Sequence, residues 1–276
     1  MPHFQLTSQQ IADYGKDGYI IVKNFLMEGE VVKLSGVAFG NNATQRHAID
    51  LNDQTGKKTR LTSWYFPGND AYGLLTKSKR IVESVDSLMD GDSAVCHFHS
   101  KLMQKEPKVG GAWEWHQDYG YWYKNEFLFP DQMISVMIAI TDANKANGCL
   151  QVIKGSHKMG RVEHGFAGEQ VGASQHYVDL ALKTMDLVYV EIEAGDALFF
   201  HSNLLHRSEA NLSDKPRWSL IACYNRSRNV PYNEPSKSSI LPLIVVPDEA
   251  LLQLETNDID ETVGFVGKDQ VHKDSE

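Results

Sequence analysis

The chain has 276 residues, of which 42% are hydrophobic, and it carries a formal net charge of -9 at pH 7. This length suits one large domain with a full apolar core. The acidic balance without a basic cluster argues against a nucleic-acid partner, and no apolar run approaches the roughly 18 residues of a membrane span.

Cysteine usage and the N-terminal residues bear on the cellular compartment. The three cysteines are few, odd in number and set in apolar segments, so we expect buried, reduced thiols and no set of disulfides. The first residues lack a basic stretch followed by an apolar one, so no signal peptide is predicted. Together these features predict a cytoplasmic protein.

Helix signals flank a polar segment near the start of the chain. Thr7 and Gln10 have the spacing of a reciprocal helix cap, which predicts a helix that begins after Thr7. Further helices are expected over residues 28–38 and 80–89. Residues 41–72 are polar and rich in turn-forming residues, so we expect an irregular loop region there, over the mouth of a site.

Short apolar segments with strand character dominate the middle of the chain. Turn signals such as Asn147-Gly148 and Gly195-Asp196 separate them. The predicted strands cover residues 94–103, 133–140, 149–153, 197–201 and 217–224. Such a series predicts a mainly β fold, a sandwich or a roll. Residues 158–190 are predicted to be an insertion that ends in a helix over residues 178–185.

A histidine, a carboxylate and a second histidine stand out as metal ligands. His116 and Asp118 are two positions apart, and on a strand such residues point to the same face. His206 is a third donor from far downstream. Two imidazoles and one carboxylate leave three positions of an octahedral ion open, which suits non-haem Fe(II) that binds a co-substrate and O2. Arg217 could then hold a dicarboxylate by bidentate hydrogen bonds.

Other histidines of the chain are less specific indicators of a metal site. A second His-x-Asp pair, His272 and Asp274, lies in the polar tail without apolar flanks, which favours a solvated segment. In the strand predicted over residues 94–103, His97, His99 and Lys101 alternate, so we expect them on one face. That face is either a partly solvated edge or a pocket wall beside the metal.

Taken together, these segments resemble the phytanoyl-CoA dioxygenase family of Fe(II)/2-oxoglutarate oxygenases. The resemblance covers about residues 8–230 and implies a double-stranded β-helix, or jelly roll, with flanking α-helices. It also implies a single oxygenase domain over residues 1–276, in which 231–276 form a C-terminal extension. The order and spacing of these pieces carry it: Asp17-Gly18-Tyr19-Ile20-Ile21-Val22, His116-Gln117-Asp118, Asn147-Gly148-Cys149-Leu150, Gly155-Ser156-His157-Lys158, Gly195-Asp196-Ala197-Leu198-Phe199-Phe200-His201, His206-Arg207-Ser208 and Arg217.

The resemblance implies a set of site residues and cofactors. The expected cofactors are Fe(II), 2-oxoglutarate as co-substrate and O2, with ascorbate supporting activity. His206 is favoured over His201 as a ligand because it stands eleven residues before the arginine, the spacing of the family. The implied iron ligands are His116, Asp118 and His206. The implied 2-oxoglutarate contacts are Arg217, Ser208, Lys101 and Gln117.

The resemblance also suggests a substrate class. The stretches 115–123 and 156–164 look most like bacterial members that act on small metabolites, with the 2-aminoethylphosphonate dioxygenase branch as the leading assignment. The expected substrate is therefore an organophosphonate such as 2-aminoethylphosphonate or its N-trimethyl form. Donors and aromatic rings that suit its phosphonate and ammonium groups are Arg60, His99, Asn203, Tyr119 and Trp122.

Three other interpretations remain open at this point. The first is hydroxylation of another small molecule, such as an acyl-CoA, a terpenoid or an amino-acid-like compound, although no basic patch for the phosphates of CoA is evident. A hydrolytic metalloenzyme could use two histidines and an aspartate but would have no use for Arg217. An inactive binding module of the same fold would not need three ligands and the arginine.

Overall fold

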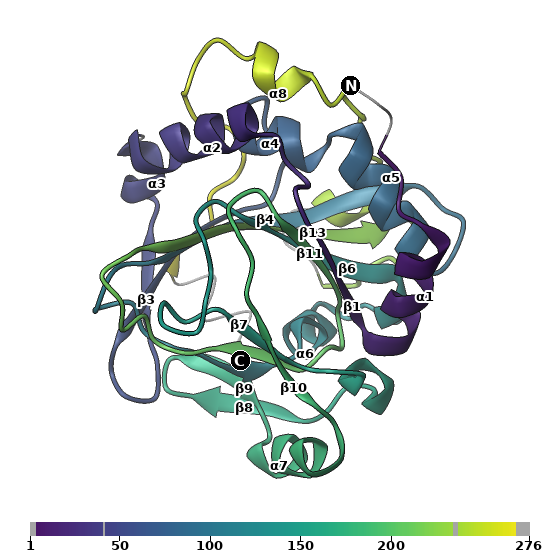
Figure 1. Ribbon diagram of the computed structural model, residues 1–276. Helices are drawn as coiled ribbons and strands as arrows, with labels where there is room; N and C mark the ends of the chain where they lie inside the picture. Colours follow the sequence, from purple (N-terminus) through teal and green to yellow (C-terminus); the bar gives the residue numbers. More distant parts are fainter. Residues whose placement is uncertain (1–3, 41, 234–236, 269–276) are drawn as a thin grey trace.

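Two antiparallel β-sheets face each other in the computed structural model, which describes residues 4–40, 42–233 and 237–268 (Figure 1). The larger sheet has the strand order β1 (Tyr19–Val22), β11 (Ala197–His201), β6 (Met133–Ala139), β13 (Arg217–Arg226), β4 (Val95–Lys105), β3 (Lys58–Trp64) and β2 (Ile49–Asn52). The smaller sheet has the order β10 (Leu187–Val190), β7 (Leu150–Ile153), β12 (His206–Ser208) and β5 (Trp113–His116). A separate hairpin of β8 (His164–Ala167) and β9 (Gln170–Ala173) lies against β5.

Helices cover the two sheets from outside (Figure 1). Those on the side of the larger sheet are α1 (Ser8–Asp17), α2 (Glu28–Gly40), α3 (Asn42–Arg46), α4 (Ala71–Thr76), α5 (Lys79–Leu88) and α8 (Ala250–Gln253). On the side of the smaller sheet, α7 (Gln175–Thr184) packs its buried residues against that sheet. The short helix α6 (Asp118–Trp122) directly follows β5. Single 3-10 turns occupy Tyr123–Asn125, Pro130–Gln132, Ser156–Met159 and Ser238–Ile240.

Successive residues of the central strands pack into two different hydrophobic cores, one on each face of the larger sheet. Val136 of β6 packs among the helix-side residues, whereas Met137 packs between the two sheets. Phe199 and Phe200 of β11 divide in the same way. Because successive side chains of a strand point to opposite faces, a strand that is covered on both sides needs apolar residues throughout. This explains why β6 is apolar at every position except Ser135, whose hydroxyl donates to Asp118.

Most of the predicted elements are confirmed. Thr7 caps α1, and its side chain and that of Gln10 form the reciprocal cap. The helices predicted over residues 28–38 and 80–89 correspond to α2 and α5, and all five predicted strands are present. The cysteines are buried and free. In the described residues, no helix is both long and apolar enough to cross a membrane.

The expected loop over residues 41–72 is wrong. The segment contains α3, β2 and β3, and β3 pairs with β4 over residues 60–64. Polar residues concealed the hairpin because β2 and β3 form the edge of the larger sheet, where one face is partly solvated. The insertion over residues 158–190 likewise holds the hairpin of β8 and β9, which was not expected, before its predicted helix.

The C-terminal residues return to the body of the protein. Isolated bridges join Cys96 to Pro242, Ser78 to Val246 and Trp64 to Phe265. Over residues 237–268 the C-terminal extension forms the short helix α8 and the 3-10 turn at Ser238–Ile240. The second His-x-Asp pair, at His272 and Asp274, lies outside the described residues.

Candidate active site

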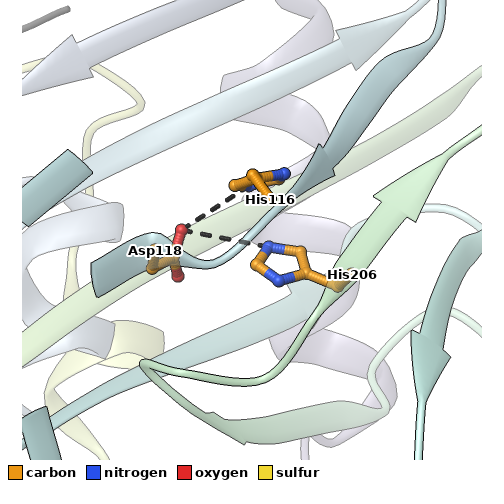
Figure 2. A group of neighbouring side chains, drawn as sticks. All are labelled: His116, Asp118 and His206. Carbon is orange, nitrogen blue, oxygen red and sulfur yellow. Dashed lines mark ion pairs between the residues drawn. The ribbon is translucent and has the colours of Figure 1, made fainter. Parts of the chain in front are cut away.

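Two histidines from neighbouring strands stand side by side in the smaller sheet. His116 of β5 pairs directly with His206 of β12. The Oδ1 atom of Asp118 lies 3.8 Å from Nε2 of His116 and 3.9 Å from Nε2 of His206. Figure 2 shows the carboxylate directed toward both rings. All three side chains are buried, and within the described ranges they form the one cluster of His, Cys, Asp or Glu whose ligand atoms could share a metal ion.

Asp118 reaches this cluster by a route that differs from the expected one. The strand ends at His116, Gln117 is extended, and Asp118 is the first residue of α6. The two side chains therefore do not share a strand face. The carboxylate gains from this position, because a negative charge is favourable in the first turn of a helix.

Backbone carbonyls orient both imidazoles. Nδ1 of His116 donates to the carbonyl of Glu114 over 2.7 Å, and Nδ1 of His206 donates to that of Leu204 over 2.9 Å. With the proton held on Nδ1, the lone pair of each ring remains on Nε2, which faces Asp118. Outer hydrogen bonds of this kind fix the tautomer of histidines that bind metals.

The protonation states suit a metal centre as well. Burial, followed by the neighbouring His206, holds the pKa of His116 well below its ordinary value, and burial also lowers the pKa of His206. For Asp118, burial alone would raise the pKa, but the charge of Lys101 and a hydrogen bond from Ser135 help to bring it below the ordinary value. Two neutral imidazoles and one carboxylate are the donor set of non-haem Fe(II) sites.

An inner cavity leads from the three side chains to a buried arginine. Arg217, at the start of β13, is 3% exposed and lines this cavity together with Ser208. In the described part of the chain, its guanidinium has no hydrogen bond or ion pair. Burial lowers its pKa to about 10. An unpaired buried cation is costly, so this end of the cavity is built to receive an anion.

A second buried basic residue adjoins this arginine. Lys105 of β4 pairs with Arg217 across the strands and is fully buried. Its Nζ donates to the carbonyl oxygens of Ser208 and Glu209, which holds the end of β12 in place. Burial, followed by the neighbouring Arg217, lowers the pKa of Lys105 well below the ordinary value. Sequence reasoning missed this residue.

An outer cavity of about 120 Å³ is lined by His116 and Asp118 but not by His206. Lys101 lines both cavities, and its Nζ is 4.0 Å from Oδ1 of Asp118. His99 lines the outer cavity but not the inner one. Burial keeps its pKa well below the ordinary value, so the ring is neutral. Aromatic side chains supply much of the remaining wall: Tyr65, Phe98, Trp113, Tyr121 and Trp122.

The expected shared face of His97, His99 and Lys101 is interrupted. A shift in the pairing of β13 with β4 falls between His97 and His99. His97 is buried and bonds to the carbonyl of Tyr65 and the hydroxyl of Ser100, away from the cavities. The irregularity brings Phe98 and His99 together into the outer cavity wall.

Several predicted substrate residues lie elsewhere. Arg60 pairs with Asp50 on the edge hairpin, over 2.8 and 3.2 Å, and lines neither cavity. Tyr119 donates its hydroxyl to the carbonyl of Phe127 within an apolar cluster. Asn203 is buried in the turn before His206 and is also absent from both cavity walls. These three assignments are corrected, whereas His99 and Trp122 do line the outer cavity.

The alternative ligand His201 is engaged outside the cluster. Its Nε2 donates to Asp131 over 2.9 Å, and its Nδ1 accepts from the backbone of Asn203. It lines a surface groove with His157. The choice of His206 over His201 therefore agrees with the arrangement of the buried side chains.

The side chain of Gln117 joins separate loops through hydrogen bonds and lines neither cavity. Its Nε2 donates to the carbonyls of Gly160 and Asn203, each over 2.7 Å, and its Oε1 accepts from the backbone of Val162 over 2.8 Å. The side chain is fully buried. It joins the turn that carries Asp118 to the loop before His206, so the expected co-substrate contact is replaced by a positioning role.

The substitution Gln117→Leu should weaken metal binding more than the loss of an equally buried amide outside the site does. Loss of an outer partner of a metal site typically lowers affinity about 10- to 100-fold. We expect that range for Mn(II), measured by calorimetric titration of the metal-free protein. Asn225→Leu is the matched control, because the Asn225 amide is equally buried and makes three hydrogen bonds to other loops. Equal Mn(II) affinities in the two variants would contradict the positioning role of Gln117.

Other residues of the outer cavity were not anticipated, namely Leu61, Ser63, Tyr65, Asn125 and Val266. The first three alternate along and just beyond β3. Recognition of β3 as a strand would have placed them on one face. Val266 had no signal in the sequence, since it arrives from the C-terminal extension.

Comparison with known proteins identifies the family. The phytanoyl-CoA dioxygenase (PhyH) family matches residues 14–219. The chain belongs to this family. The predicted enzyme class, an Fe(II)/2-oxoglutarate-dependent dioxygenase, is thereby confirmed.

The similar proteins act on chemically diverse compounds. L-proline trans-4-hydroxylase of Streptomyces griseoviridis is 27% identical over 79% of this chain and 86% of its own length. Phytanoyl-CoA dioxygenase 1 of Oryza sativa subsp. japonica is 31% identical over 79% of this chain and 89% of its own. The crystal structure of EctD from S. alaskensis with 2-oxoglutarate and 5-hydroxyectoine has a TM-score of 0.69 at 20% identity, covering 88% of both chains. The structural similarity to EctD confirms the jelly-roll fold.

Proposed function

We propose that this dioxygenase binds iron through His116, Asp118 and His206 and hydroxylates a small polar metabolite. One observation carries the proposal: the cavity that begins at these three side chains ends at Arg217, a buried guanidinium with no partner among the described residues. A dicarboxylate co-substrate supplies that partner. When bound, Fe(II) couples the reduction of O2 and the decarboxylation of 2-oxoglutarate to hydroxylation of the substrate.

The protein's own residues provide ligation, orientation and shielding. The two imidazoles and the carboxylate stay in the protonation states that bind a metal. Arg217 pairs with the distal carboxylate of 2-oxoglutarate, and Ser208 beside it adds a hydroxyl donor. Apolar side chains such as Met137, Leu150 and Phe200 line the rest of the inner cavity. They exclude water, which strengthens the ionic pairing.

For the substrate, we propose an organophosphonate such as 2-aminoethylphosphonate or its N-trimethyl form. Lys101 and His99 line the outer cavity and offer nitrogen donors to an anionic group. Trp113, Tyr121 and Trp122 form an aromatic wall that would attract an ammonium group by cation–π interaction. The cavity thus suits a small molecule that carries both charges.

An amino-acid-like carboxylate is the second candidate. It is favoured by the similarity to proteins named for hydroxylation of L-proline and of ectoine. The same cavity donors would serve a carboxylate, so the two candidates differ in the anionic group alone.

Succinate formation under Fe(II), 2-oxoglutarate and ascorbate distinguishes these candidates. The panel contains 2-aminoethylphosphonate, its N-trimethyl form, L-proline, ectoine and an acyl-CoA. We expect stimulation by the phosphonates. Stimulation by L-proline or ectoine alone would replace the phosphonate by a carboxylate, and absence of succinate under every condition would contradict the oxygenase itself.

Lys101→Met should raise the KM for the anionic substrate. A hydrogen bond to a charged group contributes on the order of 1.5–3 kcal/mol, which corresponds to roughly 10- to 150-fold at 1.4 kcal/mol per tenfold. The KM for 2-oxoglutarate is measured in parallel, because Lys101 borders both cavities. Lys154→Met, which removes a surface lysine paired with Asp17, is the control. A substrate KM equal to that of the control would exclude Lys101 as the anion partner.

A further inference from the structure

A segment of the C-terminal extension borders the outer cavity. This strap, residues 260–268, lies outside the residues 14–219 that the family model matches. Its backbone follows the end of β3: Val266 N–H donates to Ser63 over 2.9 Å, and Phe66 N–H donates to Val263 over 2.9 Å. The strap therefore continues the edge of the larger sheet beyond Ile49, the first residue of β2.

Both ends of the strap are tied down. At its start, the backbone N–H of Asp260 donates to Asp70 over 2.9 Å. In the middle, the ring of Phe265 stacks on that of His47 with 4.0 Å between the centroids. At its end, Nζ of Lys268 lies 3.6 Å from Glu169 in the turn between β8 and β9. These anchors hold the strap from the helix side of the larger sheet across to the hairpin beside the smaller one.

One strap side chain faces the outer cavity. Val266 is 6% exposed and belongs to the cavity wall. Ser63, which accepts its backbone hydrogen bond, pairs in turn with Lys101 of β4. Val266 is thus separated from the proposed anion donor by a single strand. It does not border the inner cavity.

We infer that the strap is the substrate-side wall of the site and that Val266 is a specificity-determining residue that limits substrate size. The inference rests on the proposed use of the outer cavity for substrate. An apolar side chain at this point excludes water and sets the width available to the group opposite Lys101. Residues outside the family match thereby shape the choice of substrate, while residues within it supply the metal and co-substrate sites.

Kinetics of two variants at this position test the inference. Val266→Trp fills the cavity and should raise the substrate KM at least tenfold for whichever of 2-aminoethylphosphonate, its N-trimethyl form, L-proline or ectoine the unmodified chain uses. The effect should fall on the substrate KM and not on that of 2-oxoglutarate. Val266→Ala widens the cavity and should favour bulkier N-alkyl homologues of the same compound severalfold. Ile244→Trp, at an 83% exposed position of the same extension, is the control.

Amide hydrogen exchange of the full chain tests the strap without any substrate. The amides of Val266, Tyr65 and Phe66 should exchange slowly, because each donates a backbone hydrogen bond between the strap and the end of β3. Exchange at the rate of an open chain would overturn the inference, and so would unchanged substrate KM values in both Val266 variants. Absence of succinate from the unmodified chain would instead remove the proposed function, and the exchange result would still decide whether the strap is docked.

Discussion

Alanine in place of His116, Asp118 or His206 is expected to abolish substrate-dependent succinate formation. Each substitution removes one of three buried donor atoms and leaves the other two without a partner that can complete the site. The loss should exceed the roughly 10- to 100-fold drop that follows removal of an outer partner of a metal site. Mn(II) titration of the metal-free variants provides a second measurement that does not depend on turnover.

A surface histidine serves as the control for this series. His176 is exposed on α7 and belongs to neither cavity. His176→Ala should retain both Mn(II) affinity and turnover. Retention of Mn(II) binding in His116→Ala or His206→Ala would mean that the metal lies elsewhere.

Arg217→Lys is expected to raise the KM for 2-oxoglutarate strongly. An ammonium group cannot form the planar pair of hydrogen bonds that a guanidinium makes with a carboxylate. Impairment of a buried charge pair costs about 2–4 kcal/mol, which corresponds to roughly 30- to 700-fold in KM. Arg60→Lys is the matched control, since Arg60 forms a bidentate pair with Asp50 on the edge hairpin and lines neither cavity. An unchanged KM in Arg217→Lys would move the anchor to another residue.

The same arginine makes a prediction about stability. Burial lowers the pKa of Arg217 from its ordinary value to about 10, so its charged form is less favourable in the folded chain than in the unfolded one. This destabilisation is present at every pH below about 10 and is relieved as the pH rises from there toward the ordinary pKa of an arginine. Its size is on the order of 3 kcal/mol at 1.36 kcal/mol per pKa unit.

Arg217→Met should therefore raise the Tm of the ligand-free protein at pH 7. A well-packed apolar side chain of similar length often equals or exceeds a buried charge in stability. The variant should also lose the increase in Tm that 2-oxoglutarate causes in the unmodified protein. A lower Tm in the ligand-free variant would show that the guanidinium already has a compensating partner.

How much of the fold and the site could be predicted depends on how far apart in the chain the interacting residues lie. The capping box at Thr7 and Gln10 and the apolar runs of the central strands are local patterns, and these elements appeared where expected. The fold and the convergence of His116, Asp118 and His206 followed from a resemblance in motif order and spacing. The single-domain organisation and the boundary at residue 230 remain predictions.

What failed depended on hydrogen-bond partners in other strands and loops. Arg60 looked like a substrate donor until its pairing with Asp50 across the edge hairpin was known. Gln117 looked like a co-substrate contact, but its side chain bonds to backbone groups of two other loops. A polar residue in a sequence carries no indication of which distant carbonyl or carboxylate will accept its hydrogens.

The sequence by itself determined most of the strand and helix pattern, because side-chain spacing is a local property, and it predicted the donor types of a metal site and an arginine for a co-substrate. The tertiary structure decided which polar side chains face a cavity. It placed Asp118 on a helix, turned His97 away at an irregularity in β4, and brought Val266 beside Ser63 from the C-terminal extension. The last two depend on sheet pairing between segments far apart in the chain, which no local pattern encodes.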